Sequence, residues 1–411
     1  MTLNYEDLAN YVDTCAGIRV RTGLEPLGGP NTKIFPPTYG VADGALKYAT
    51  ENRVVRGTDG ETKKVESVVL SSVAQQAHVL SNALSDAVYD GFALPRIGVD
   101  FSTVEGLEDF GIHTDLEVPH RVYDAILRDS IDGDLPFRSG TIGKAITNAT
   151  TKNASPLFRH APTVALFGGW DSTGPKGGRG SKFERAITSE IVATDIAVGV
   201  KTSSRIDPLG IEIKGTKIYR TPDNSWTLDE SEALKEKGKP KELKPSEINH
   251  GNVTPSIDET AGGITAGSIE STTTISFIQL RRLRFVSDAD GSPLPADTRS
   301  QVGTAARATL AALGIAATAL SFENGFDLRS RCVLAPTADL TFEVIARDGS
   351  ITEFSISGQD ALALTTEAAN QTAKAGLPWR DDLHLLTPTP RLVEVVRKSR
   401  AASEAVVAAE D

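Results

Sequence analysis

A glycine-rich segment with interleaved cations is the part of the sequence whose residue types most clearly suggest chemistry. It spans residues 166–186 and reads LFGGWDSTGPKGGRGSKFERA. Glycine lets backbone N–H groups approach an anion closely, and lysine or arginine then neutralises the anion's charge. The segment therefore predicts a phosphate cradle, with a surface loop whose glycines only make turns as the alternative. The residues assigned to this cradle are Lys176, Gly177, Gly178, Arg179 and Lys182.

The same segment has part of the spacing of a nucleotide-binding P-loop. Gly169 and Gly174 stand at the right separation, but Pro175 occupies the position where a P-loop requires lysine. The pattern G-K-[ST] does not follow either. These departures argue against a nucleoside triphosphate site.

A second group of cations ends the segment STTTISFIQLRRLRF, residues 271–285, which has the composition of a strand. Alternation would place Arg282 and Arg284 on one face and Arg281 on the other. Arginine on an open sheet can pair with phosphates and stack on bases, although at a strand end it is more often a solvated rim. Other cations that could extend the same basic face are Arg19, Arg21 and, in the run SSRIDPLG, Arg205.

Residue patterns of catalytic sites are scarce. The six histidines are scattered, without HExxH or another local metal spacing. Asp171 could hold a metal or activate a 2′-hydroxyl, but an aspartate that accepts local backbone N–H bonds in a turn is the favoured interpretation. Trp170 could stack on a base, with packing in the core favoured. We expect no catalytic residue, metal or cofactor.

The composition limits the classes of protein. The chain has 411 residues, 39% of them hydrophobic, and a formal charge of -11 from 54 acidic and 43 basic residues. An acidic chain of this size can form a core, and it can bind a polyanion only through a local basic patch. Cys15 and Cys332 are isolated, without a disulfide framework or zinc spacing, and the N-terminus lacks signal-peptide features. A cytoplasmic protein that does not span a membrane is expected.

The elements that would position these residues follow from hydrophobic periodicity. A short helix is expected before Gly17, a strand over 18–29, and an amphipathic helix over 66–89. TVALFGG predicts a buried strand and KFERAITSEIVATD a helix, so the glycine-rich segment would join a strand to a helix. Residues 86–117, with eight carboxylates and the single base Arg96, predict a solvated surface or a protein contact.

Further along, a strand over 271–285, a helix over 298–314 and a strand over 326–336 are expected, then a hairpin that turns at Asp348 and Gly349. Residues 215–267 are poor in apolar residues and predict a projecting insertion. Helices are expected at the end of the chain. The whole order predicts an α+β fold with a ferredoxin-like or RNA-recognition-motif βαββαβ core, interrupted twice.

Taken together, these segments resemble one family. RVYDAILRDS and PFRSGTIGKAI are followed by the glycine-rich segment, SRIDPLGI, RRLRF and FDLRSRCVLAP, in one order through residues 121–336. They are similar to the RAMP-superfamily backbone subunit (Cas seven family) of the type I-G, formerly I-U, CRISPR Cascade complex. The resemblance implies a palm with fingers-like and thumb-like insertions. Its divisions would be 1–29 for the N-terminal helix and first palm strand, 30–153 for the fingers, 154–214 for the palm with the glycine-rich loop, 215–267 for the thumb, 268–360 for more palm, and 361–411 for C-terminal helices.

The resemblance also implies a function. The chain would be a non-catalytic subunit that binds CRISPR guide RNA, oligomerises head to tail along the spacer with other Cascade subunits, and presents bases for pairing with target DNA. It would grip the RNA backbone and leave sequence recognition to base pairing. The RNA contacts carried over are the cradle residues with Arg205, Arg282, Arg284 and Arg21. Two alternatives remain open: a type III-like backbone endoribonuclease that cleaves target RNA with Asp171, and a nucleotide-binding enzyme that uses the glycine-rich loop.

Overall fold

The computed structural model describes residues 3–56, 60–174, 180–211, 217–236, 238–380 and 382–407. The chain divides into two compact units, which are described separately. The first comprises Met1–Pro37, Ala49–Ile196 and Thr265–Thr389, and the second comprises Thr38–Tyr48, Ala197–Ile264 and Pro390–Asp411.

A large sheet forms the centre of the first unit. Its strands lie in the order β19-β20-β1-β18-β10-β3-β2, and β21 and β22 are added beside β1. β1 pairs antiparallel with β18, from Gly17 opposite Ser276 to Leu24 opposite Ile269. The strand bounds are β1 Gly17–Pro26, β2 Thr50–Arg56, β3 Thr62–Ser71, β10 Ile187–Val198, β18 Ile264–Ser276, β19 Phe326–Arg329, β20 Cys332–Pro336, β21 Phe342–Ile345 and β22 Ile351–Phe354.

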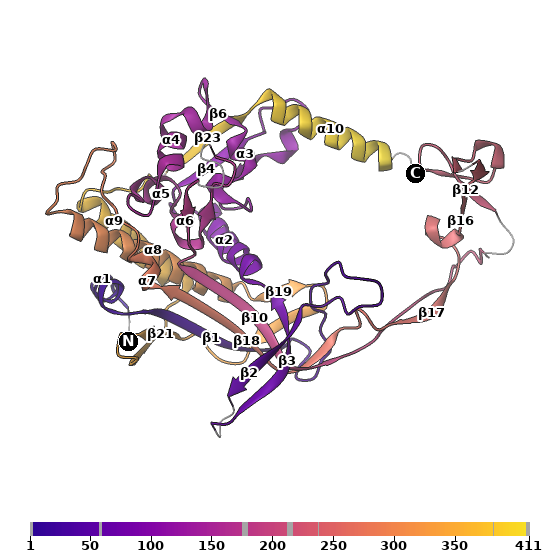
Figure 1. Cartoon of the computed structure of the whole chain (residues 1–411), viewed down its shortest axis with the longest axis horizontal. Coiled ribbons are helices and arrows are strands. Elements are labelled where there is room, and N and C mark those ends of the chain that lie inside the picture. The colour runs from indigo at the N-terminus through magenta and orange to yellow at the C-terminus, as the bar shows by residue number, and fades with distance from the viewer. Residues whose placement is uncertain are drawn as a thin grey trace. The chain divides into compact units, whose positions relative to one another are not determined.

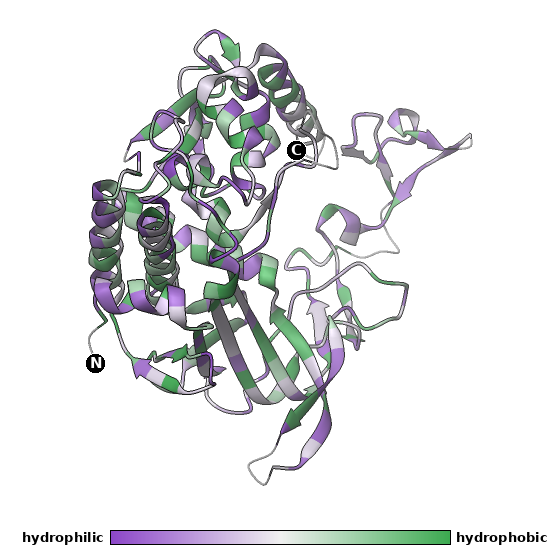
Figure 2. Ribbon diagram, turned by 60° about the vertical axis from the view of Figure 1, so that its left-hand side comes forward, coloured by the Kyte–Doolittle hydropathy of each residue, from purple (hydrophilic) through white to green (hydrophobic). Residues whose placement is uncertain are grey.

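Helices cover one face of this sheet (Figure 1). Alternate residues of β1 point toward them, so Ile18, Val20 and Leu24 are buried while Arg21 lies on the outward face. Hydrophobic and polar residues accordingly mix along the strands (Figure 2). The helices are α1 Tyr5–Thr14, α2 Val73–Tyr89, α6 Pro162–Phe167, α7 Phe277–Leu280, α8 Arg299–Glu323 and α9 Gly358–Lys374.

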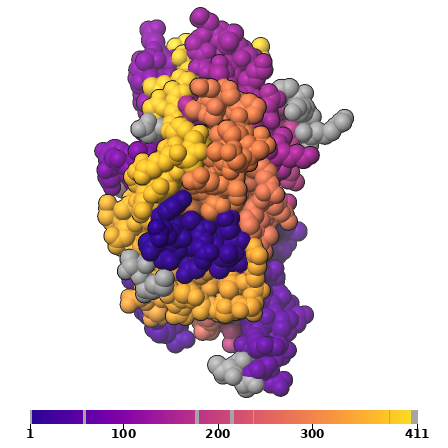
Figure 3. Space-filling model, turned by 90° about the vertical axis from the view of Figure 1, so that its left-hand side faces the viewer, coloured from indigo at the N-terminus to yellow at the C-terminus, as the bar shows by residue number. Residues whose placement is uncertain are grey.

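Helix α8 is the central helix of the core. By length and composition it is the one helix in the described ranges that could cross a membrane, yet 83% of its most apolar window is buried inside the protein. Helix α1 packs on it, and in Figure 3 the indigo N-terminal segment lies against orange and yellow segments. The buried Arg307 of α8 pairs with Asp13 of α1 at 3.0 Å. The burial of α8 and its contacts with α1 indicate that it is a helix of the protein core.

A second sheet in the first unit joins distant parts of the chain. Its order is β5-β4-β23-β6-β7, and β23, near the C-terminus, pairs parallel with β4 and antiparallel with β6. Residues 96–136 therefore depend on a strand far away in sequence. The remaining described elements of the unit are β4 Arg96–Asp100, η1 Glu108–Phe110, β5 Ile112–Thr114, η2 Arg121–Tyr123, α3 Ala125–Arg128, β6 Ser130–Asp132, β7 Leu135–Pro136, η3 Phe137–Ser139, α4 Thr141–Asn148, α5 Ser155–His160, β8 Gly169–Trp170, β9 Lys182–Phe183 and β23 Leu383–Pro388.

The described part of the second unit contains short strands, the helix α10 and the 3-10 helices η5 Glu230–Glu232 and η6 Pro245–Ile248. A two-stranded ribbon pairs β11 with β17, and the Tyr48 hydroxyl accepts a hydrogen bond from the Gly263 amide at 2.7 Å, which ties residues 38–48 to this unit. The bounds are β11 Lys201–Arg205, β12 Ile218–Arg220, β13 Trp226–Thr227, β14 Lys235–Glu236, β15 Lys239–Pro240, β16 Glu242–Leu243, β17 Val253–Asp258 and α10 Pro390–Val407.

Several sequence predictions are confirmed. The protein is a mixed α+β structure with a large antiparallel sheet. The helix expected over 298–314 is the first part of α8, and β21 and β22 form the hairpin expected around Asp348 and Gly349. The last described element is a helix, α10.

Other predictions are wrong, and two of them concern the elements on either side of the glycine-rich segment. TVALF belongs to helix α6, whose six residues are all buried and so lack an amphipathic period. KFERAITSEIVATD forms β9 and most of β10, where buried and less buried residues alternate from Ile187 to Ile191. The segment therefore joins a helix to a strand, the reverse of the expected order.

Three further boundaries differ. The helix expected over 66–89 begins only at Val73, because residues before Ser72 complete β3. The strand expected over 271–285 ends at Ser276, where α7 begins, so the three arginines do not lie on a strand. FDLRSRCVLAP is the hairpin of β19 and β20, with Arg331 at a positive φ of 63° in its turn.

Candidate nucleic-acid interface

The glycine-rich segment is held at its base by the short hairpin of β8 and β9. Trp170 lies opposite Lys182, and the Asp171 amide donates a hydrogen bond to the Ser181 carbonyl at 2.9 Å. Gly168, at φ 80°, leads into β8, and a Cβ there would lie 3.0 Å from the Phe183 carbonyl oxygen. This glycine is thus required for close packing of the chain on itself.

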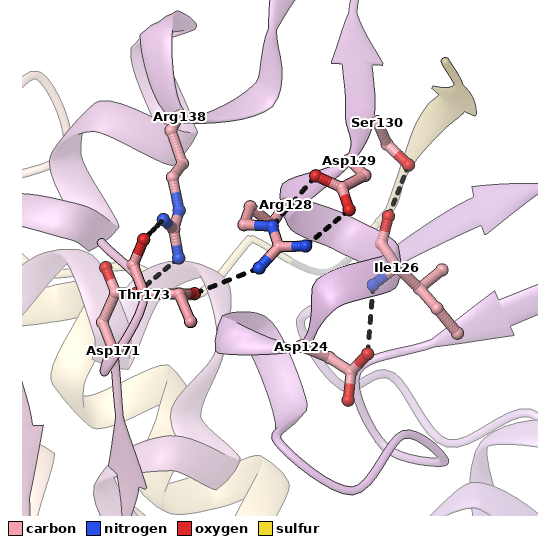
Figure 4. Close-up of polar contacts among 8 residues, drawn as sticks. All are labelled: Asp124, Ile126, Arg128, Asp129, Ser130, Arg138, Asp171 and Thr173. Atoms are coloured by element: carbon pink, nitrogen blue, oxygen red, sulfur yellow. Dashed lines mark hydrogen bonds and ion pairs between the residues drawn. The ribbon is translucent and has the colours of Figure 1, made fainter. Parts of the chain in front are cut away.

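Arginines from the preceding part of the chain fix this base (Figure 4). The Arg138 guanidinium pairs with the Asp171 carboxylate and donates to the Thr173 carbonyl at 2.9 Å. Arg128 reaches the Thr173 hydroxyl at 3.4 Å, and its pairing with Asp129 at 2.6 Å raises the Arg128 pKa. The segment therefore leaves the hairpin from a fixed position.

The Asp171 carboxylate pairs with an arginine side chain, not with the local backbone N–H groups that the sequence favoured. Its side chain is 1% exposed and pairs with Arg138, and a Cβ at Gly174 would collide with its carboxylate. Across the described part of the chain, no group of three or more His, Cys, Asp or Glu side chains is arranged to hold a metal.

Lys182 and Arg282 line one surface hollow of about 450 Å³, although they lie far apart in sequence. Glu184 lies in the same hollow and pairs with Arg282. The other lining residues are Thr151, Ala165, Ala186, Gln279 and Leu283.

Two more exposed cations adjoin this hollow. The Arg284 amide donates to the Thr151 carbonyl at 2.8 Å, and the Ala154 amide donates to the Arg284 carbonyl at 2.7 Å, so the chain around Lys152 runs beside Arg284. The cationic cluster consists of Lys152, Lys182, Arg282 and Arg284, with Glu184 as the carboxylate that lines its hollow.

The outward face of the large sheet carries a second groove, of about 780 Å³, which Arg21 and Arg53 line. Arg21 pairs with Glu270 at 2.6 Å, and Arg53 pairs with Glu190 at 2.9 Å. Carboxylates of the same face thus compensate both of these guanidinium groups. Arg19 is likewise paired, with Glu343 at 2.5 Å.

The remaining predicted contacts are Arg205 and four residues of the glycine-rich segment. Arg205 lies in the second unit, where it donates to the carbonyls of His250 and Gly251 at 2.7 and 3.2 Å. Arg281 donates to the carbonyls of Val12 and Cys15. Lys176, Gly177, Gly178 and Arg179 lie outside the described residues.

Three residues of this region were not singled out from the sequence: Arg128, Arg138 and Lys152. The two arginines lie in segments that carried the family resemblance, RVYDAILRDS and PFRSGTIGKAI. Only the fold shows that both reach Thr173. Lys152 is one of many isolated surface lysines, and no sequence signal distinguishes it.

Comparison with known families gives one match. Residues 18–198 match the family model described as CRISPR-associated protein GSU0053 (Cas_GSU0053). The matched region is less than half of the chain, and it includes β1, the hairpin of β8 and β9, Arg138 and Lys182. A search of curated proteins found no match. Over residues 18–198 the chain is thus similar to the GSU0053 family of CRISPR-associated proteins, which indicates a role in CRISPR defence.

Proposed function

We propose that this protein is a non-catalytic backbone subunit that binds CRISPR guide RNA in a Cascade effector complex, of type I-G and the RAMP superfamily. Copies of it would assemble head to tail along the spacer, together with other Cascade subunits, in the cytoplasm of a prokaryotic cell. The guide bases would stay available for pairing with target DNA.

The observation that carries this proposal is the cationic cluster. In a chain with a formal charge of -11, Lys182 and Arg282 line one hollow beside the glycine-rich segment, and the exposed Lys152 and Arg284 follow the lining residues Thr151 and Leu283 in the chain. Lysine and arginine bind the sugar-phosphate backbone independently of base sequence. A guide-binding subunit needs this property because it must accept any spacer.

The acidic remainder of the surface is consistent with assembly. Seven of the eight carboxylates in residues 86–117 lie outside the buried core, the exception being Asp115, and such a surface repels RNA. An interface that joins one surface of a copy to a different surface of the next copy does not close on itself and gives an open filament. The bound RNA would then set the length of that filament.

The test is RNA binding measured against salt. The triple variant Lys182→Ala, Arg282→Ala and Arg284→Ala should bind single-stranded RNA more weakly for every sequence tested. Each lost phosphate contact should reduce the slope of log K against log salt by roughly 0.7. A matched control removes three exposed cations from helices α9 and α10, with Lys374→Ala, Arg391→Ala and Lys398→Ala. The proposal fails if the two triple variants lose affinity and slope equally, or if the wild-type protein does not bind RNA.

A further inference from the structure

Trp170 is an exposed aromatic residue on a fixed hairpin. Its residue surface is 50% exposed, which makes the packing role favoured from the sequence wrong. Trp379, by contrast, packs against Phe158 with ring centroids 5.7 Å apart. Tryptophan gains most from burial, so a half-exposed ring beside a cationic cluster is a candidate contact surface.

The surroundings of Trp170 hold its ring in place. Lys182, directly opposite on β9, places its ammonium over the ring at 5.6 Å from the centroid. The next residue, Asp171, is buried and paired with Arg138. Behind the strand, a Cβ at Gly169 would lie 3.0 Å from Val164, so the backbone of β8 rests directly on α6. The ring therefore projects from a backbone that has little freedom to move.

We propose that Trp170 is a stacking platform for one unpaired nucleobase of a bound RNA strand, and that Lys182 binds an adjacent phosphate. This inference rests on the proposed function. One side of the indole carries the Lys182 ammonium, and half of the Trp170 surface remains open to a base. Single-stranded nucleic acid is bound in this way elsewhere, by aromatic rings that stack on bases beside cations that follow the backbone. Stacking tolerates any sequence because every base has a π-face.

The two roles predict different salt behaviour. Stacking releases no counterions, so Trp170→Ala should lower RNA affinity and leave the salt slope unchanged, whereas Lys182→Ala should reduce the slope. The loss for Trp170→Ala should be about 5- to 150-fold, the range that corresponds to one stacked base. Trp170→Phe should keep part of this affinity. Tyr89→Ala removes another exposed aromatic residue, at the end of α2, and should have no effect.

A spectroscopic measurement keeps the test independent of the stability of the variants. The fluorescence of 2-aminopurine placed at successive positions of the RNA should be quenched at one or more of them when wild-type protein binds. The quenching should be weaker when Trp170→Phe binds. If wild-type protein binds RNA but Trp170→Ala binds equally well, or Trp170→Phe quenches equally, the platform is wrong while the proposed function stands. If Trp170→Ala keeps RNA affinity and loses self-assembly, the ring contacts protein and the platform is again wrong. Failure of wild-type protein to bind RNA would overturn both.

Discussion

The guanidinium of Arg138 and the carboxylate of Asp171 form an ion pair that connects η3 to the hairpin carrying the glycine-rich segment. Asp171 is almost fully buried, and Arg138 also donates to the Thr173 carbonyl at 2.9 Å. Both strands of this hairpin contribute to the region of the cationic cluster, since β8 carries Trp170 and β9 carries Lys182. The pair therefore supports the proposed RNA contacts without touching RNA.

Removing the cation of this pair should destabilise the protein strongly. Arg138→Met leaves the buried Asp171 carboxylate without its partner, and breaking a buried pair in this way typically lowers the free energy of unfolding by about 3–5 kcal/mol. Chemical denaturation would measure the loss. The matched control is Arg380→Met, because Arg380 pairs with Asp382 at a more exposed site and its loss should lower stability by less than about 1 kcal/mol. The double variant Arg138→Met and Asp171→Leu should recover part of the stability. If Arg138→Met lowered the free energy of unfolding no more than Arg380→Met, the structural role given to the pair would be wrong.

Asp171→Asn should separate the structural role of this residue from a catalytic one. Asparagine keeps the shape of the side chain but loses the charge that pairs with Arg138, so stability should fall. Incubation of the assembled complex with complementary RNA and magnesium should give the same products for wild type and variant. Periodic cleavage by the wild type that Asp171→Asn abolishes would show that the carboxylate is catalytic. Asp129→Asn, which changes the carboxylate paired with Arg128, serves as the control for charge loss nearby.

Glu184→Gln should strengthen RNA binding. Glu184 pairs with Arg282 inside the hollow and competes with phosphate for that guanidinium. An exposed pair of this kind contributes about 0.2–1 kcal/mol, so its release should raise affinity by roughly 1.4- to 5-fold and make the salt slope steeper. Titrations at several salt concentrations would measure both effects. Glu394→Gln, which breaks the exposed pair with Lys398 on α10, is the control, and equal gains for the two variants would mean only a change in net charge.

Some of this site follows from local sequence patterns. Lys182 and Arg282 were both identified from the sequence, because a glycine-rich segment and a run of arginines are recognisable without a fold. That they share a hollow is a tertiary fact. The pair of Arg138 and Asp171 was not predictable, since nothing local to either residue indicates the other.

The errors in secondary structure have a common physical origin. α6 is buried on all sides, so TVALF has neither a helical nor an alternating pattern. In β10 the buried positions include Ser189 and Ala193, which weakens the contrast between faces that marks a strand. The first part of helix α8 was predicted correctly because alanine and leucine, which favour helices, are frequent in it, whereas Gly314, where the predicted helix ended, does not end α8. Likewise, no periodicity could reveal that β23 completes a sheet with β4.

Asp115 should make the stability of the protein depend on pH. Its carboxylate is fully buried, where it accepts a hydrogen bond from the Ile97 amide at 2.9 Å and lies near Arg121 and Thr163. Burial raises its pKa to about 7, against the opposing effects of those neighbours. The folded state therefore holds this proton more tightly than the unfolded state, whose carboxyl titrates near pH 4. The contribution to stability is full below about pH 4 and is lost as the pH rises to about 7.

His160 should act in the opposite direction over an overlapping range. Burial, followed by repulsion from Arg159, Arg380 and His384, lowers its pKa to about 4, so the folded state loses stability as the pH falls from about 6.5 to 4. In the wild-type protein the two groups should partly offset each other. Asp115→Asn removes one of them, so its free energy of unfolding should decline more steeply on acidification between pH 6.5 and 4, by a difference on the order of 4 kcal/mol at most. Denaturation curves at several pH values would measure this, with the exposed Asp195→Asn as control. Parallel pH profiles for Asp115→Asn and wild type would mean that Asp115 is ionised in the folded protein throughout this range.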